Sequence, residues 1–143
     1  MKKCVLFVDD EQNMLDALRR MLRPMTVEWD MHFARSGDEA LMVLAQEPVD
    51  VVITDLRMPG MDGGELLKII QESRPDVVRI VLSGHADYNM VMKSVKQAHQ
   101  FLTKPCSTDV IREALEKAYN LRRILTNEAA KAIVSRIESL PSV

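Results

Sequence analysis

Residues 51–60 of the chain are Val-Val-Ile-Thr-Asp-Leu-Arg-Met-Pro-Gly, and this segment is the strongest indication of the fold class. Its consecutive β-branched apolar residues predict a strand that is buried on both faces, as in the middle of a parallel sheet. The strand ends at the carboxylate of Asp55, and Pro59-Gly60 then signals a turn. Open parallel sheets bind ligands beyond the carboxyl ends of their strands, so Asp55 is well placed for chemistry. Taken alone, however, the position is better interpreted as a residue that only caps a turn.

The rest of the chain alternates short apolar runs with helical patterns. We predict strands over residues 4–8, 29–34, 49–54, 77–82 and 100–103. Apolar residues spaced by three and four predict helices over residues 11–23, 38–46, 63–72 and 87–97, and a last helix capped by Ser107 or Thr108. This alternation predicts the α/β class, with helices on both faces of a parallel sheet. With right-handed crossovers, we expect a flavodoxin-like, doubly wound, five-stranded sheet in the order 2-1-3-4-5.

The composition is that of one ordinary soluble domain. The 143 residues are 47% hydrophobic and 28% charged, enough for a single core. With 19 basic and 21 acidic residues, the net charge of -2 does not favour binding to nucleic acid or to a membrane surface. No apolar run approaches the roughly 18 residues of a membrane span, and the N-terminal run is too short for a signal peptide. We therefore expect a cytoplasmic protein, with Cys4 and Cys106 unpaired in a reducing compartment.

Chemically informative side chains follow four of the predicted strands. They are Asp9 and Asp10 after the first strand, Asp55 after the third, Ser83 after the fourth and Lys104 after the fifth. The fold brings these strand ends to one edge of the sheet. Close carboxylates repel one another unless a cation joins them, and oxygen ligands suit Mg²⁺, with Mn²⁺ as an alternative.

A divalent cation, a lysine and a hydroxyl that face one carboxylate form a phosphoryl-transfer site. We expect Asp55 to be the nucleophile and to form an acyl phosphate. The cation and Lys104 would neutralise charge on the phosphoryl oxygens, and Ser83 would hydrogen-bond one of them. Gly84 leaves space beside that hydroxyl.

These residues resemble the receiver domain of two-component response regulators. The matching segments are Asp9-Asp10, residues 55–63 (Asp-Leu-Arg-Met-Pro-Gly-Met-Asp-Gly), Ser83-Gly84 and Lys104-Pro105. The resemblance covers about residues 3–122. It implies a regulatory phosphoacceptor domain, which receives a phosphoryl group from a cognate histidine kinase and catalyses only its own phosphorylation and dephosphorylation.

The resemblance also implies a role for each pocket residue. Asp10 and Asp55 would bind Mg²⁺ directly, Asp9 would act mainly through a water, and the Arg57 carbonyl would be a further ligand. Lys104 would pair with the phosphoryl group, and the Lys104-Pro105 bond would be cis.

Ser83 and Phe101 match the hydroxyl and aromatic switch positions of the family. The change would be relayed through the fourth helix, the fifth strand and the last helix. His85 lies just past Ser83 and could tune the access of water, although a plain loop histidine is the better interpretation.

The C-terminal segment indicates a connection to something else. We expect a receiver domain over residues 1–122 and a helical linker over residues 123–143, toward a C-terminal output domain that this sequence lacks. Residues 83–87, 98–106 and 135–142 resemble receivers fused to an HDOD domain, and less closely those fused to HD-GYP domains. The apolar stripe of the linker favours a homodimer or output coupling over a helix folded back on its own domain. It either extends the last helix or breaks near Thr126.

Two other functions remain as alternatives. The first is a receiver-like scaffold that is never phosphorylated and signals by protein contact. The second is an aspartate-nucleophile phosphatase, a class that resembles this site but carries a second Asp two residues after the nucleophile. Arg57 occupies that position here and argues against the phosphatase.

Overall fold

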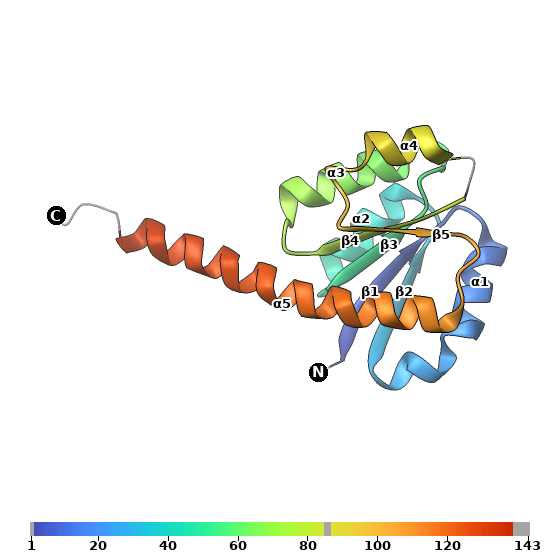
Figure 1. The fold of residues 1–143 in the computed structure, drawn as a ribbon, viewed down its shortest axis with the longest axis horizontal. Coiled ribbons are helices and arrows are strands. Elements are labelled where there is room, and N and C mark those ends of the chain that lie inside the picture. Colours follow the sequence, from blue (N-terminus) through green and yellow to red (C-terminus); the bar gives the residue numbers. More distant parts are fainter. Residues whose placement is uncertain (1, 85–86, 139–143) are drawn as a thin grey trace.

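The computed structural model of the chain describes residues 2–84 and 87–138, with side chains as far as residue 128 in the last helix. A five-stranded parallel sheet in the order β2-β1-β3-β4-β5 forms its centre (Figure 1), which confirms the predicted α/β class and strand order. The strands are β1 (Lys3–Val8), β2 (Trp29–Ala34), β3 (Val51–Thr54), β4 (Val78–Ser83) and β5 (Gln100–Thr103). Every residue of β3 is buried, as its continuous apolar sequence predicts.

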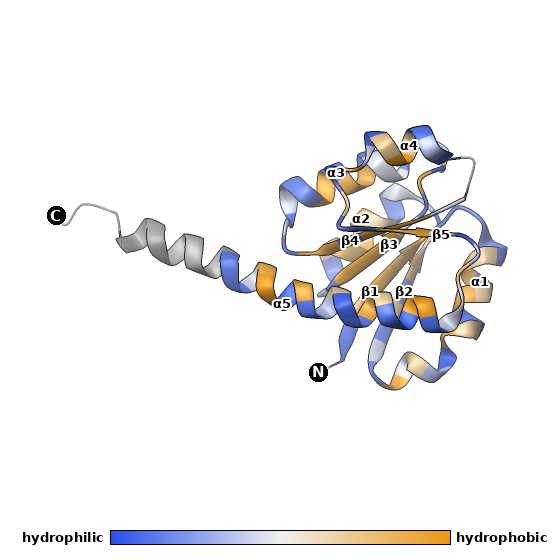
Figure 2. Ribbon diagram, viewed as in Figure 1, coloured by the Kyte–Doolittle hydropathy of each residue, from blue (hydrophilic) through white to orange (hydrophobic). Residues whose placement is uncertain are grey.

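Helices cover both faces of the sheet. They are α1 (Gln12–Met21), α2 (Gly37–Gln46), α3 (Gly63–Ser73), α4 (Tyr88–Lys93) and α5 (Thr108–Glu138), with a 3-10 turn, η1 (Arg23–Val27), after α1. On one face, α1 and α5 pack against the sheet through Leu15, Leu18, Ile111 and Leu115. On the other face, α2 and α3 bury Ala40, Leu44, Leu66 and Ile70. Figure 2 shows the apolar strands enclosed between these helical layers.

Helix boundaries follow local capping. The Ser36 hydroxyl accepts from the Glu39 amide at 3.1 Å, and Asp62 caps α3 through the Glu65 amide at 2.8 Å. Of the two predicted caps of α5, Ser107 makes the bond, accepting from the Val110 amide at 3.3 Å.

Two helices are shorter than the sequence predicts. The first ends at Met21, and Pro24 lies in the 3-10 turn η1, which the sequence pattern did not indicate. The predicted helix over residues 87–97 is reduced to α4, Tyr88–Lys93. The buried hydroxyl of Ser94 donates to the Met90 carbonyl at 2.9 Å, and such a side-chain bond competes with continued helical pairing. Met92 and Val95, two of the apolar residues whose spacing predicted the longer helix, are exposed.

Helix α5 runs without a break from Thr108 to Glu138 and extends away from the sheet (Figure 1). The alternative of a break near Thr126 is wrong, because the helical structure continues through Thr126 to Glu138. Leu121 and Leu125 still pack against the core. Among the described residues, no helix combines the length and apolar character needed to cross a bilayer.

Candidate phosphoacceptor and metal site

The acidic residues meet because β1 and β3 are neighbours in register. Val8 pairs with Thr54, so Asp9 and Asp55 leave the two strands side by side. The Asp55 amide donates to the Val8 carbonyl at 2.9 Å and continues the ladder. Carboxylate oxygens of Asp9, Asp10 and Asp55 lie within 4.8 Å of one another. The structure thus brings together the three carboxylates that the sequence selected.

Lys104 reaches this cluster from the end of β5. Its Nζ lies 2.9 Å from Asp9 Oδ2 and 3.2 Å from Asp55 Oδ2. The Lys104-Pro105 bond is cis, as the resemblance implied. The Lys104 amide donates to the Ser83 carbonyl at 2.8 Å, so the lysine backbone is tied to the strand end that carries the hydroxyl.

Burial and charge act together on these groups. Burial raises the pKa of Asp55, and the charge of Lys104 lowers it. The charge of Asp9 raises it further, so that the pKa of Asp55 lies above its ordinary value. Burial alone would lower the pKa of Lys104, but its hydrogen bond with Asp9 and the charges of Asp55 and Asp9 raise it above the usual range. Lys104 therefore stays charged and faces two carboxylates.

A divalent cation fits this donor set. Asp9 and Asp55 are 3% and 7% exposed, so water screens their repulsion poorly. Lys104 supplies one positive charge against three carboxylates, which leaves a surplus of negative charge at the cluster. Oxygen ligands of this kind suit Mg²⁺ and Mn²⁺. An open cleft of about 450 Å³, lined by Asp10, Arg57 and Pro59 among others, gives access from solvent.

The two predicted switch positions lie on β4 and β5, the strands that follow β3 in the sheet. Ser83 is the last residue of β4 and is buried. Phe101 in β5 is half-buried and packs against Leu56, Leu67 and Val81. Among the described residues, a β-carbon at Gly84 would meet only Asp87 Oδ2, at 3.7 Å, which agrees with the space that we predicted beside Ser83. His85 lies outside the described residues.

Sequence reasoning did not single out Gly63 as a site residue. A β-carbon there would lie 2.1 Å from the Asp55 carbonyl oxygen and 2.8 Å from the Leu56 Cα, so only glycine fits. The Gly63 amide donates to the Leu56 carbonyl at 2.9 Å and closes the loop back onto the end of β3. The Gly63-Gly64 pair was the available signal, but sequence alone does not show what a glycine approaches.

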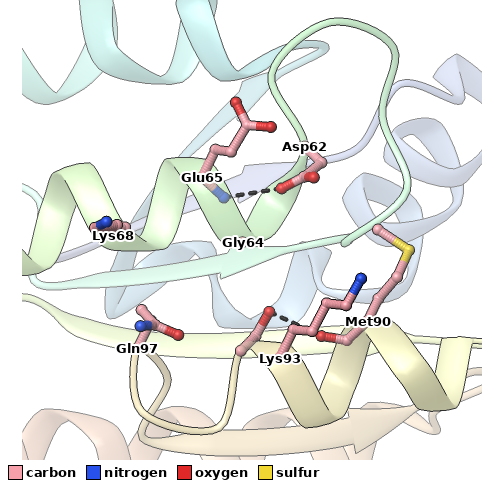
Figure 3. A pocket seen from close by; sticks show the side chains of 8 residues that line it. Asp62, Gly64, Glu65, Lys68, Met90, Lys93 and Gln97 are labelled. Atoms are coloured by element: carbon pink, nitrogen blue, oxygen red, sulfur yellow. Dashed lines mark hydrogen bonds between the residues drawn. The ribbon is translucent and has the colours of Figure 1, made fainter.

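A second cleft, of about 390 Å³, lies between α3 and α4 (Figure 3). Asp62 and Met90 line both this cleft and the open cleft beside Asp10. Its polar side chains include Lys68, Lys93 and Gln97. None of the residues that line it belongs to the carboxylate cluster. The cleft shows instead that α4 is not packed tightly on α3.

The fold and the site define a doubly wound α/β domain with an acidic pocket, which can hold a cation, at the carboxyl edge of its sheet. Residues 5–116 match the family model described as the response regulator receiver domain, and the chain belongs to this family. It is therefore a regulatory domain of two-component signal transduction and not a catalytic one, which removes the basis for the phosphatase hypothesis.

Similar proteins agree with this assignment. The hydrogenase transcriptional regulatory protein HoxA of Cupriavidus necator is 41% identical over 118 residues, which are 78% of this chain and 24% of that protein. The transcriptional regulatory protein GlrR of Escherichia coli K12 is 37% identical over 134 residues, 92% of this chain and 30% of that protein. The chain thus spans less than a third of either relative. The solved signal receiver domain of an HD domain-containing protein from Pseudomonas fluorescens is 31% identical with a TM-score of 0.80, covering 86% of this chain and 98% of that one.

Proposed function

We propose that Asp55 accepts a phosphoryl group from a phosphohistidine of a sensor kinase, or from a small phosphodonor, and that the chain acts as a phosphorylation-dependent switch. The observation that carries this proposal is the carboxylate cluster with Lys104 across it. Lys104 contacts both Asp9 and Asp55, so its ammonium lies beside the oxygen that would attack and can pair with the incoming phosphoryl group.

In the transfer, a carboxylate oxygen of Asp55 bonds to phosphorus while the P–N bond of the phosphohistidine breaks. The electron pair of that bond stays on the imidazole nitrogen, and the product is an acyl phosphate. Lys104 stabilises negative charge on the phosphoryl oxygens, and the Ser83 hydroxyl donates to one of them. Mg²⁺, or Mn²⁺, held by Asp9, Asp10, Asp55 and the Arg57 carbonyl, would supply further charge neutralisation.

The phosphoryl group would then shift a two-state equilibrium. Ser83 moves toward it, Phe101 turns inward, and the change reaches α4, β5 and α5. Moving such an equilibrium from 1:99 to 99:1 requires about 5.5 kcal/mol of differential binding. The contacts of Lys104 and Ser83 with the phosphoryl group exist only after transfer and supply part of this.

The proposed arrangement is a receiver domain over residues 1–122 and a helical linker over residues 123–143. The linker leads to a C-terminal output domain, for which we propose the HDOD type. The linker also provides a surface for a homodimer. The unbroken extension of α5 supports a linker that can carry a signal away from the sheet. The solved receiver from an HD domain-containing protein supports an output of the HD type, whereas HoxA and GlrR are named as transcriptional regulators. Free Cys4 and Cys106 support a cytoplasmic location.

The test is treatment with acetyl phosphate and Mg²⁺, followed by intact mass spectrometry. The wild type should gain one phosphoryl group, and Asp55→Asn should gain none. Asp38→Asn, which removes an exposed carboxylate at the start of α2, should be modified like the wild type. An unmodified wild type, also unchanged by beryllofluoride with Mg²⁺, would overturn the proposal and favour the scaffold.

A further inference from the structure

An ion pair joins the two loops that flank the phosphoacceptor. Arg57 lies two residues after Asp55, in the loop between β3 and α3, and its Nε pairs with Oδ1 of Asp87. Asp87 lies immediately before α4, in the loop that follows Ser83. The Asp87 side chain is 7% exposed and that of Arg57 is 62% exposed, so a largely buried carboxylate is neutralised by a guanidinium from the neighbouring loop.

Asp87 also fixes the backbone directly behind the switch hydroxyl. Its Oδ2 accepts from the Gly84 amide at 3.0 Å, and its own amide donates to the Gly84 carbonyl at 3.2 Å. These two bonds tie Asp87 to Gly84, the residue after Ser83. A displacement of Ser83 toward a phosphoryl group would pull on Gly84 and hence on Asp87. The ion pair with Arg57 opposes that displacement.

Helix α4, which begins at the next residue, is weakly held. None of the six residues that the structure describes in α4 is buried. A cleft separates it from α3, as Figure 3 shows, and the Gln71 side chain reaches across to the Lys96 carbonyl at 3.1 Å. Only Met90 and Val91 of α4 pack, partly buried, against the apolar core, so the ion pair at its start adds to a small set of contacts that fix its position.

We propose that the Arg57–Asp87 pair is a latch that stabilises the unphosphorylated position of Gly84, Asp87 and α4, and that it opens when the domain switches. The proposal rests on the phosphorylation switch described above and adds two positioning residues to it. Breaking the latch raises the population of the switched conformation before any phosphoryl group is present.

The sharpest variants are Asp87→Asn and Arg57→Gln. An asparagine retains an oxygen that can accept from the Gly84 amide and loses only the charge. The two substitutions remove charges of opposite sign near the pocket, so a direct electrostatic effect on the site would shift the conformational equilibrium in opposite directions in the two variants. If the pair is a latch, both variants shift the equilibrium in the same direction, toward the switched conformation. Arg112→Gln, which removes an exposed pair with Asp109, is the matched control.

The measurement is the position of the Gly84 and Phe101 amide resonances without phosphodonor. In both variants they should move along the line that joins free and beryllofluoride-bound wild type, and the double variant should move no further than the larger single one. The guanidinium end of the pair is 62% exposed, so water screens the interaction. A pair worth about 1 kcal/mol shifts the equilibrium about fivefold, so beryllofluoride should half-saturate at about a fivefold lower concentration. The Arg112→Gln variant should match wild type in both measurements.

Resonances that stay in place, or that move in opposite directions in the two variants, overturn the latch. If wild type binds beryllofluoride and the variants do not shift, the latch alone is wrong. If wild type does not bind beryllofluoride, the phosphorylation switch fails and the latch fails with it.

Discussion

The acidic pocket depends on a glycine that carries no chemistry. Gly63→Ala places a β-carbon 2.1 Å from the Asp55 carbonyl oxygen, against backbone that cannot rotate away. We expect the free energy of unfolding to fall by about 1–3 kcal/mol, the usual cost of overpacking. We also expect slower phosphorylation, because the substitution displaces Asp55. Urea unfolding and acetyl phosphate labelling measure the two effects.

Two other glycines provide controls for this substitution. Gly84→Ala makes one ordinary contact, at 3.7 Å, and should be nearly neutral for stability. Gly60 has open space around it but a φ of +75°, so Gly60→Ala should cost about 1 kcal/mol through backbone strain alone. A Gly63→Ala variant as stable as Gly84→Ala would contradict the close approach.

His99 makes stability depend on pH. Its Nδ1 accepts from the Arg79 amide at 2.9 Å, which requires a neutral ring, and burial followed by the charge of Arg79 lowers its pKa to about 4. The folded pKa lies below the unfolded value of 6.5, so unfolding takes up a proton between these values. The stability from neutral His99 is therefore complete above pH 6.5 and is lost as pH falls toward 4.

Urea unfolding at several pH values tests this dependence. Between about pH 6.5 and 5, where most carboxylates stay ionised, the free energy of unfolding of wild type should fall with the slope of one proton. His99→Asn retains an acceptor for the Arg79 amide and should show a flatter profile. Parallel profiles for the two proteins would exclude His99 as the titrating group.

At the scale of elements, Arg122 fixes the place where α5 leaves the sheet. Its guanidinium pairs with Asp76, two residues before β4, and lies 3.5 Å from Asp50, the residue before β3. The Arg122 side chain is only 20% exposed. These contacts lie at the opposite end of the strands from Asp55, so α5 is anchored to the sheet away from the pocket.

Arg122→Ala should therefore loosen α5 and destabilise the domain. It leaves two partly buried carboxylates without this partner, and we expect a cost of about 1–3 kcal/mol. Amide exchange should become faster in α5 around residues 118–128. Lys117→Ala, which removes an exposed pair with Glu113 on the same helix, should leave exchange and stability close to wild type. Equal effects of the two variants would show that Arg122 is not an anchor.

For the whole molecule, the sequence predicts the features that depend on hydrophobic periodicity and on the residues at the strand ends. The strand order, the Ser36 cap and the meeting of Asp9, Asp10 and Asp55 were accessible because parallel strands align their carboxyl ends. Contacts between loop residues that do not directly follow a strand were not accessible.

The clearest example of an unpredicted contact is the Arg57–Asp87 pair. Its two residues lie 30 positions apart, and no helical or strand periodicity relates them. The length of α4 also escaped prediction, because it depends on a tertiary environment that buries Ser94 and turns its hydroxyl onto a helical carbonyl. Local patterns determine the layers of this fold, whereas tertiary contacts determine where α4 ends and which loop residues pair.

The stability of the entire domain should respond to Mg²⁺, because only the folded state gathers three carboxylates within 4.8 Å. A ligand that binds only the folded state adds about 1.4 kcal/mol at ten times its Kd. Thermal unfolding at constant ionic strength should therefore move to higher temperature with Mg²⁺. Asp10→Asn should lose most of that shift, and without Mg²⁺ it should be at least as stable as wild type, since one repelling charge is gone. Asp38→Asn should keep the full shift, and an Asp10→Asn variant that also kept it would place the cation elsewhere.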